Sequence, residues 1–426
     1  MIKKIQLKNG LTVLYAPLKG TRAVTVLSMF PVGSRYEDPK LAGASHFVEH
    51  MLFKGTDKRA DYLSISRELD SAGADYNAFT YKDYTGYYVK VDSDRAELAF
   101  DFISDIAFKS HLPESEVQKE KGVIVEEIRM YEDNPSMAIE LLYDRAMFGD
   151  HYLGRDIAGS ADTVNAMTQK DLVEYYHKYY SPGNAVVAVT GNLDPKKLKK
   201  YLKYFSDMPA GKPAAALSKY QKFVFEKTPL SLADRVLVKE KVLDQAHLMM
   251  GFPGINYKSK QMPAMAVMLT ILGGGMSSRL FVEVREKRGL AYMVRATSSS
   301  FRDCGTVDIR AGLDPARLEE AVKTINAEVE KMKNEPVSNQ ELKDAKTCIV
   351  GRLALALEDG GIMAERAAKQ FWFQDEIESF EDIKRKVNKV TVKDIQKIAK
   401  LVLDTNYRRV AIIGPVKKET IIKILQ

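Results

Sequence analysis

The hydrophobic and polar positions near the start of the chain follow a period of two. Residues 1–17 alternate apolar and polar side chains on both sides of an Asn-Gly pair at positions 9 and 10. Because Asn-Gly favours the tight turn of a hairpin, this segment predicts two short antiparallel strands. A mostly apolar run from Thr25 predicts another strand, and residues 74–81 and 86–92 repeat the alternation and predict two more.

Other segments follow the period of a helix. Residues 62–73 and 115–133 place apolar side chains every three or four positions, as amphipathic helices do. Pro113 lies just before the longer segment and marks the start of its helix. Strands joined by long helices, with hairpins among them, predict an α+β fold in which sheets pack against helices.

A segment with the pattern of a helix followed by a strand occurs twice along the chain. "VNAMTQKDLVEYYHKYY" from Val164 and "VNKVTVKDIQKIAKLVL" from Val387 each predict an amphipathic helix that begins at a Thr with an Asp three positions later. Each helix is followed by an apolar strand that ends at a glycine, and the paired positions lie 223 residues apart (391 minus 168, and 414 minus 191). We therefore expect two homologous α/β sandwich domains with mixed, mainly antiparallel sheets, related by internal duplication.

A segment rich in proline, alanine and glycine separates the two copies. Residues 206–223 read "SDMPAGKPAAALSKYQKF", a composition typical of a linker. We place the domain boundary near residue 215. The expected domains are residues 1–215 and residues 216–426.

Composition and charge are those of a globular protein. The 426 residues are 45% hydrophobic and 28% charged, and the net charge of +7 is the small difference between 64 basic and 57 acidic residues. This mild excess gives no reason to expect a nucleic-acid partner, and the densest basic run, residues 196–200, has the spacing of a solvated helix face. No window reaches the roughly 18 apolar residues of a membrane span. With only two cysteines and no recognisable signal sequence, we expect a cytoplasmic protein.

The first candidate metal-ligating residues lie in "GASHFVEHMLFKG". His46, Glu49 and His50 occupy positions i, i+3 and i+4 of a predicted helix, so they project from one face. The alternative is a helix whose histidines are ordinary polar residues, but the chain has only six histidines. Neutral imidazoles suit Zn²⁺, and the absence of nearby cysteines favours a catalytic over a structural zinc site.

A catalytic zinc needs a third protein ligand. The segment "EKGVIVEEIRM" offers Glu120 and Glu127, which lie two turns apart on one helix face, and also Glu126. Spacing alone does not decide between Glu126 and Glu127. The other histidines (His111, His151, His177 and His247) lack paired spacing, and we expect them to be structural.

These motifs resemble the pitrilysin and insulinase family of zinc metallopeptidases with an inverted His-x-x-Glu-His motif, in its small two-domain form, similar to the mitochondrial processing peptidase. The resemblance covers both halves of the chain. In that family the third ligand lies about 77 residues after the second histidine and seven after another glutamate. Here 127 minus 50 is 77 and 127 minus 120 is seven. The resemblance therefore implies Glu127 as the ligand and Glu120 as the carboxylate that orients a ligand imidazole.

Further site residues are implied by the same resemblance. "DYNAFTYKD" is similar to an edge strand that takes the substrate backbone as an added strand, which assigns substrate binding to Asn77 and Ala78. "LGGGMSSRLFVEVREKRGLAYMV" contains three glycines but no Gly-Lys-Ser/Thr, which argues against a nucleotide-binding loop. It resembles instead the second-half motif in which Arg285 and Tyr292 complete the active site and contact substrate.

The resemblance implies a zinc endopeptidase that hydrolyses extended peptides inside a chamber. One Zn²⁺ per chain would be held by the two histidines and Glu127, with Glu49 as general base. Larger family members carry four such domains in one chain, so a two-domain chain is expected to form a homodimer whose sites are completed in trans. The alternatives are a catalytically silent subunit of a related complex and a zinc hydrolase acting on something other than peptides.

Overall fold

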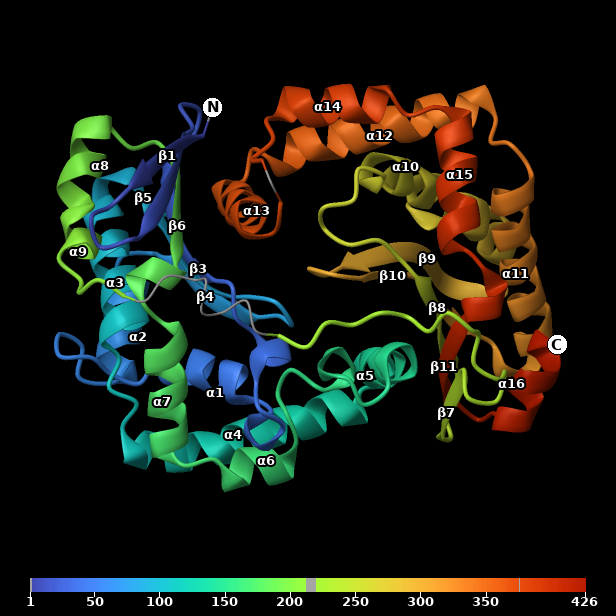
Figure 1. Cartoon of the computed structure of the whole chain (residues 1–426), viewed down its shortest axis with the longest axis horizontal. Helices are drawn as coiled ribbons and strands as arrows, with labels where there is room; N and C mark the ends of the chain where they lie inside the picture. Colours follow the sequence, from blue (N-terminus) through green and yellow to red (C-terminus); the bar gives the residue numbers. More distant parts are fainter. Residues whose placement is uncertain (1, 212–219, 375) are drawn as a thin grey trace. The chain divides into compact units, whose positions relative to one another are not determined.

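The computed structural model describes residues 2–211, 220–374 and 376–426, and these residues group into two compact units. The first unit comprises residues 1–130, 155–221 and 355–379, and the second comprises residues 131–154, 222–354 and 380–426. Each unit holds one sheet packed against helices (Figure 1). The expected α+β fold is confirmed. The boundary expected near residue 215 lies outside the described residues.

The sheet of the first unit has six strands in the order β1-β2-β6-β3-β5-β4. All neighbours are antiparallel except β2 and β6, which are parallel. The Asn-Gly hairpin predicted at the start of the chain is confirmed by the pairing of the first two strands. The strands are β1 (Lys3–Gln6), β2 (Thr12–Pro17), β3 (Ala23–Phe30), β4 (Asp75–Thr80), β5 (Thr85–Asp92) and β6 (Val186–Gly191).

Helices of the first unit cover this sheet. Alternation along β3 sends Val24 and Val26 into the core formed with α3, and sends Thr25 to the opposite face. The helices are α1 (Ala44–Met51), α2 (Tyr62–Ser71), α3 (Ala96–Lys109), most of α4 (Glu114–Asp133), α6 (Ala161–Ala166), α7 (Gln169–Tyr179), α8 (Pro195–Tyr201), α9 (Lys203–Ser206) and α13 (Gly360–Phe373).

The sheet of the second unit has five strands in the order β7-β11-β8-β10-β9, with only β7 and β11 parallel. The strands are β7 (Val236–Glu240), β8 (Ala246–Pro253), β9 (Ala291–Ser300), β10 (Gly305–Leu313) and β11 (Arg409–Gly414). The helices are α5 (Pro135–Phe148), α10 (Met262–Gly273), a π-helix (Phe281–Glu286), α11 (Leu318–Asn334), α12 (Asn339–Ala356, whose last two residues fall in the first unit), α14 (Phe380–Asn388), α15 (Val392–Val402) and α16 (Lys418–Leu425).

The repeated helix-strand segments fold alike. Thr168 caps α7 and Thr391 caps α15, and in both the Asp three residues later completes a capping box. Such reciprocal bonds satisfy backbone N–H groups that a helix start leaves unpaired. The strands that follow, β6 and β11, are fully buried and end at Gly191 and Gly414. The predicted start and end of both copies are confirmed.

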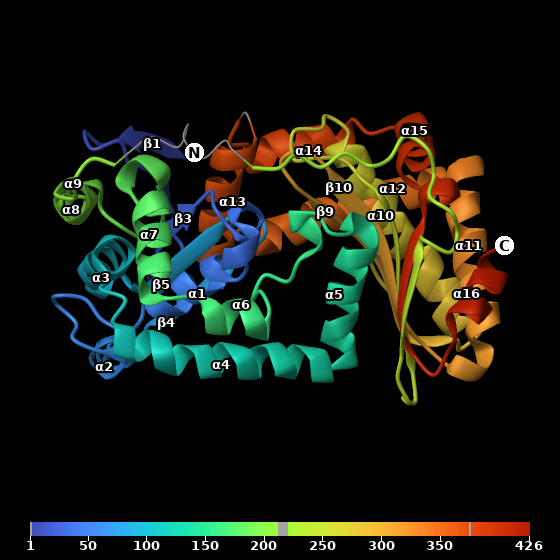
Figure 2. The same cartoon turned by 60° about the horizontal axis from the view of Figure 1, so that its bottom comes forward.

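One helix from each half of the sequence packs in the unit formed mainly by the other half. Helix α5 packs on β8 and β11 of the second unit (Figure 2), where a Cβ on Gly251 would come within 2.4 Å of the Tyr143 ring. Helix α13 packs on β3 and β6 of the first unit, and Thr190 Oγ1 donates to the Gly360 carbonyl at 2.7 Å. Each sheet therefore depends on a helix that comes from the other half.

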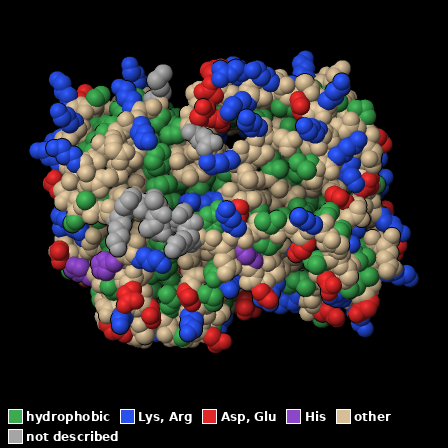
Figure 3. Space-filling model, viewed as in Figure 1, with side chains coloured by type: hydrophobic (Ala, Val, Ile, Leu, Met, Phe, Trp, Pro, Cys, Tyr) green, Lys and Arg blue, Asp and Glu red, His purple; other side chains and the backbone are tan. Residues whose placement is uncertain are grey.

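The surface charge agrees with the composition. On the face seen in Figure 3, basic and acidic side chains are interspersed. The lysines of residues 196–200 are exposed on α8 while Leu198 is buried, as expected for a solvated helix face. Within the described ranges, we find no helix with both the length and the apolar character required to cross a membrane.

Candidate active site

Helix α1 carries the histidine motif, and a buried carboxylate fixes its start. Gly43 at the N-cap has φ of +100°, a left-handed conformation that favours glycine, and a Cβ there would meet the Ala158 carbonyl at 2.4 Å. Glu37 accepts hydrogen bonds from the N–H groups of Gly43 and Ser45, each at 2.7 Å. Burial raises the pKa of Glu37 to about 7, against the opposing effect of these two hydrogen bonds.

Two imidazoles and one carboxylate converge between α1 and α4. His46 Nε2 and His50 Nε2 lie 3.3 Å apart, and Glu127 Oε2 lies 3.6 Å from the first and 3.5 Å from the second. Two nitrogens on one tetrahedral zinc would lie about 3.3 Å apart, given Zn–N distances of about 2.0–2.1 Å. The donor set and its spacing therefore fit Zn²⁺. Among the residues the structure describes, this is the one group of three His, Cys, Asp or Glu side chains found to converge in this way.

The other two candidate glutamates of α4, Glu120 and Glu126, occupy different positions. Glu120 Oε1 accepts from His50 Nδ1 at 2.9 Å, while its Oε2 contacts Lys54 Nζ at 2.7 Å. The bond to Glu120 places the proton of neutral His50 on Nδ1 and leaves Nε2 facing Glu127. Glu126 points elsewhere and pairs with Arg129 at 2.5 Å. Of the two adjacent glutamates that spacing could not separate, the structure brings only Glu127 to the histidines.

The pKa values of the two imidazoles are shifted in opposite directions. Burial and the neighbouring His50 lower the pKa of His46 to about 4, although Glu127 and Glu120 oppose this shift. Burial also acts to lower the pKa of His50, but hydrogen bonds to Glu120 and Glu127 outweigh it and raise the value to about 9. The pKa of Glu120 is lowered because His50 and Lys54 outweigh its burial. The lowered pKa keeps the Glu120 carboxylate ionised beside His50, which favours a cation at the cluster.

Glu49 lies on the same helix, turned toward the edge of the sheet. Thr80 Oγ1 donates a short hydrogen bond to Glu49 Oε2, and burial raises the pKa of the Glu49 carboxyl. Thr80 is the last residue of β4 and shares a sheet face with Ala78. Sequence reasoning missed Thr80, although alternation from Ala78 offered the signal.

Strand β4 forms an edge of the first sheet as described, since it pairs with β5 alone. Asn77 lies opposite Tyr88 and is exposed, and Ala78 lies opposite Tyr87. The Ala78 N–H donates to Asn77 Oδ1 at 2.9 Å. The strand that ends beside Glu49 thus presents one open backbone edge.

Arg285 and Tyr292 belong to the second unit, where they lie together. The Arg285 guanidinium stacks 4.7 Å from the Phe281 ring and 5.0 Å from the Tyr292 ring, measured to the ring centroids. Tyr292 is 76% exposed and is the second residue of the edge strand β9. Both line a cavity of about 630 Å³ whose wall also contains the three glycines 273–275 and Arg352. None of the described residues that form this wall has an acidic side chain.

Known proteins resemble this chain in sequence and in fold over nearly its whole length. The sequence profile "Insulinase (Peptidase family M16)" matches residues 12–161, and the profile "Peptidase M16 inactive domain" matches residues 166–348. An uncharacterized zinc protease of Streptomyces coelicolor is 36% identical over 98% of this chain and 90% of its own length. Among solved structures, a protease from Helicobacter pylori has a TM-score of 0.89 at 24% identity, covering 97% of this chain and all of that one.

A further structural neighbour is a chain of complex III from Candida albicans, with a TM-score of 0.83 at 17% identity and full coverage of both chains. The fold is therefore shared by a protease and by a chain of complex III. The zinc-type donor group lies within the segment matched by the insulinase profile. With a relative above 30% identity over nearly the whole length, the chain belongs to the insulinase family of M16 peptidases.

Proposed function

We propose that this protein is a zinc-dependent endopeptidase that cleaves extended peptides. The observation that carries the proposal is the convergence of His46, His50 and Glu127 in a spacing that suits zinc, with the partly buried carboxylate of Glu49 on the same helix as the two histidines. The described donors number three, and a catalytic zinc keeps its fourth position for water or substrate. The zinc protease name of the relative supports the same activity.

The roles of the side chains follow from their positions. Bound Zn²⁺ would supply a Lewis acid that polarises the scissile carbonyl and lowers the pKa of the attacking water. Glu49 Oε1 or Oε2 would accept the proton of that water and later deliver it to the leaving amine. A carboxyl whose pKa is raised by burial is suited to both steps near neutral pH. Thr80 would hold the carboxylate in place during this exchange.

Substrate would bind as an added strand on β4. Main-chain hydrogen bonds to an open edge read the backbone and not the sequence, so many extended peptides could bind and rigid folded proteins could not. Asn77 Oδ1 already accepts from the Ala78 N–H, so the Asn77 amide would have to turn aside to free this donor. Alternate substrate side chains would then share the face of Ala78 and Thr80.

The parts of the proposal that rest on the family resemblance concern Arg285, Tyr292 and assembly. Tyr292 would donate a hydrogen bond to the developing oxyanion and Arg285 would hold substrate carbonyls. In a two-domain chain these groups would come from a second copy, giving a homodimer with a chamber and two sites. The exposure of Tyr292 is compatible with such contacts. Arg285 Nε pairs with Glu286 at 3.6 Å, so its guanidinium would exchange part of this contact for substrate.

The second candidate function is a catalytically silent subunit. The observation in its favour is the structural likeness to a chain of complex III. The complete donor set and Glu49 argue against it, because a silent subunit has no need of them.

The test is incubation of the purified protein with a mixture of unstructured peptides and one stably folded domain, followed by mass spectrometry. We expect cleavage at internal peptide bonds, loss of cleavage with a chelator, recovery on adding zinc, and an intact folded domain. No cleavage by the zinc-loaded protein would favour the silent subunit. Efficient cutting of the folded domain would contradict strand addition.

A further inference from the structure

Lys54 closes a chain of charged contacts that reaches a metal ligand. It lies four residues after His50, and its Nζ is 2.7 Å from Glu120 Oε2. The other oxygen of Glu120 accepts from His50 Nδ1 at 2.9 Å. The three side chains are 16%, 7% and 20% exposed, so solvent competes little for these bonds. We propose that Lys54 is a positioning residue that holds Glu120 against His50 and thereby strengthens zinc binding, an inference that rests on the proposed metal site.

The physical argument concerns the freedom of the Glu120 side chain. A carboxylate bound through one oxygen still rotates about that contact, whereas one bound through both oxygens has a fixed plane. Charge-assisted hydrogen bonds are about twice as strong as neutral ones, so Lys54 on one oxygen and His50 on the other leave Glu120 one orientation. Because Glu120 also sets the tautomer of His50, fixing the carboxylate fixes the direction of the ligand Nε2.

The two ligand histidines differ in this respect. His46 Nδ1 is buried and has no hydrogen-bond partner among the described residues. His50 Nδ1, by contrast, is held by Glu120, which Lys54 holds in turn. Orientation of the ligand pair therefore depends mainly on the Lys54–Glu120–His50 chain.

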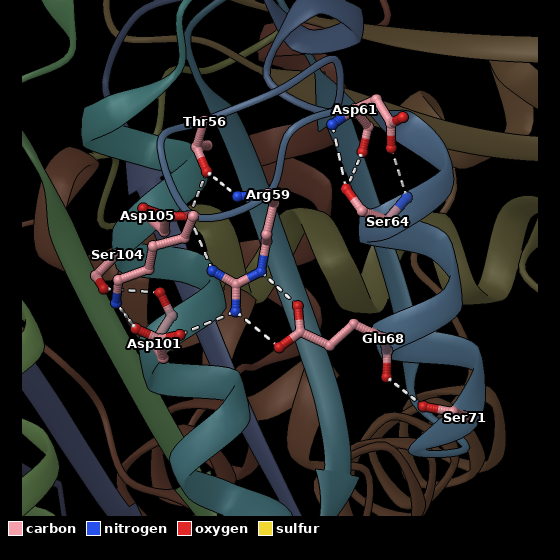
Figure 4. A network of polar contacts seen from close by, with 10 residues as sticks. Thr56, Arg59, Asp61, Ser64, Glu68, Ser71, Asp101, Ser104 and Asp105 are labelled. Carbon is pink, nitrogen blue, oxygen red and sulfur yellow. Dashed lines mark hydrogen bonds and ion pairs between the residues drawn. The ribbon is translucent and has the colours of Figure 1, made fainter.

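The backbone that carries Lys54 is anchored by a separate network, shown in Figure 4. In the turn that follows, Arg59 is 4% exposed and pairs with Glu68 at 2.5 Å, Asp101 at 2.9 Å and Asp105 at 2.8 Å. Thr56 Oγ1 donates to the same Asp105 carboxylate at 2.6 Å. Lys54 thus sits between the end of α1 and a turn tied to α2 and α3, so its side chain starts from a fixed position.

Whether removing Lys54 weakens or tightens zinc binding distinguishes a positioning role from a purely electrostatic one. A lysine near a metal site repels a cation, so charge alone predicts that removing Lys54 tightens zinc binding. Positioning predicts the opposite, because an unanchored Glu120 no longer holds the His50 imidazole. Partners of this kind typically change metal affinity by about 10–100-fold.

The test is the zinc dissociation constant, measured by competition with a chromophoric chelator. We expect Lys54→Met to bind zinc about tenfold more weakly and Lys54→Arg to bind nearly as the wild type does. Lys119→Met is the matched control, because Lys119 is an exposed lysine of α4 that pairs with Glu116 at 2.5 Å and takes part in neither network. Thermal unfolding of the metal-free variants checks that Lys54→Met keeps the wild-type fold.

A double-mutant cycle tests the route of the effect. If Lys54 acts through Glu120, then Lys54→Met adds no further loss in a Glu120→Gln background. Unchanged or tighter binding by Lys54→Met would overturn the proposal, and so would a loss of the same size in both backgrounds. These readouts need no cleavage, so an active enzyme with an unaffected Lys54→Met variant would refute the positioning role alone. A wild-type protein that binds no zinc would refute the proposed function.

Discussion

At the scale of single residues, metal binding and proton transfer at the proposed zinc site belong to different side chains. His50 and Glu127 point their donor atoms at a common centre, whereas Glu49 is turned toward Thr80. We therefore expect about one zinc per purified chain, with His50→Ala and Glu127→Gln losing it and Glu49→Gln keeping it. Elemental analysis after dialysis measures this directly.

The control for zinc content is an exposed histidine outside the site. His111 pairs with Asp57 at 3.0 Å and is half exposed, so His111→Ala should retain the metal. Full zinc occupancy in His50→Ala would refute the ligand assignment.

Glu37 gives the first unit a pH-dependent stability. Its pKa rises from 4.5 to about 7 on folding because it is buried, so the folded state binds its proton more tightly than the unfolded state. Its contribution is therefore fully present below about pH 4.5 and is lost as the pH rises through about 7. A shift of this size corresponds to a loss of about 3 kcal/mol in the free energy of unfolding.

Urea unfolding of the wild type and of Glu37→Gln, both with chelator, isolates the contribution of Glu37 to the free energy of unfolding. Glutamine stays neutral, so the stability of the wild type relative to the variant should decline between pH 4.5 and pH 7.5 and then level off. Identical pH profiles for the two proteins would contradict the assignment to Glu37.

Sequence spacing predicted the helical placement of the histidine motif. The i, i+3, i+4 placement of His46, Glu49 and His50 requires only a helix, and α1 is one. Alternation places Thr80 on the same strand face as Ala78, but the contact of Thr80 with Glu49 and the contact of Glu37 with the start of α1 could not be derived from spacing. Glu37 reaches the start of α1 through an intervening turn, and Thr80 reaches Glu49 from another element.

At the scale of elements, the sheet of the first unit depends on helix α13, which comes from the second half of the chain. It packs on the face of β3 and β6 that carries Thr25 and Thr190. A fragment of residues 1–221 lacks this helix and leaves that face uncovered. We expect the fragment alone to aggregate or to lose cooperative unfolding, and coexpression with residues 222–426 to restore a folded complex.

Glycine variants of the second fragment sharpen this experiment. A Cβ on Gly360 would meet Thr190 Oγ1 at 2.9 Å, whereas a Cβ on Gly351 would meet nothing within 4 Å. Gly360→Leu should therefore weaken the rescue and Gly351→Leu should not. Cooperative folding of residues 1–221 alone would show that the sheet does not need α13.

Sequence periodicity predicted the helices and strands, but it did not predict that α5 and α13 each pack in the unit formed mainly by the other half of the chain. The capping boxes at Thr168 and Thr391 and the Asn-Gly hairpin are local signals, and all three are confirmed. An amphipathic pattern shows that a helix buries one face, but it does not show which sheet it packs on. The destinations of α5 and α13 are set by tertiary packing, as at Gly251 and Gly360.

At the scale of the whole molecule, the zinc donors and the Arg285–Tyr292 pair belong to different units. If each site is completed by a second copy, then homodimers of Glu49→Gln and of Tyr292→Phe should both be poorly active. A mixed dimer would have one site with Glu49 intact and Tyr292 donated by the partner, so mixing the two variants should restore activity. Peptide cleavage by coexpressed, separately tagged variants measures this recovery.

The control for this complementation is a dimer in which one chain carries both substitutions and the other carries neither. It has no site with both Glu49 and the donated Tyr292, so it should stay poorly active if the sites are completed in trans. Mixed dimers that form but show no recovery would refute the shared site, as would a fully active monomer.

The central claim is that Glu49 drives peptide hydrolysis at a zinc centre built by His46, His50 and Glu127. The most direct measurement compares cleavage of one unstructured peptide by wild type and by Glu49→Gln, each loaded with one zinc per chain. We predict equal zinc content and a loss of cleavage of at least 10²-fold in the variant, the low end of the usual general-base contribution. Equal cleavage rates at equal zinc content would contradict the account.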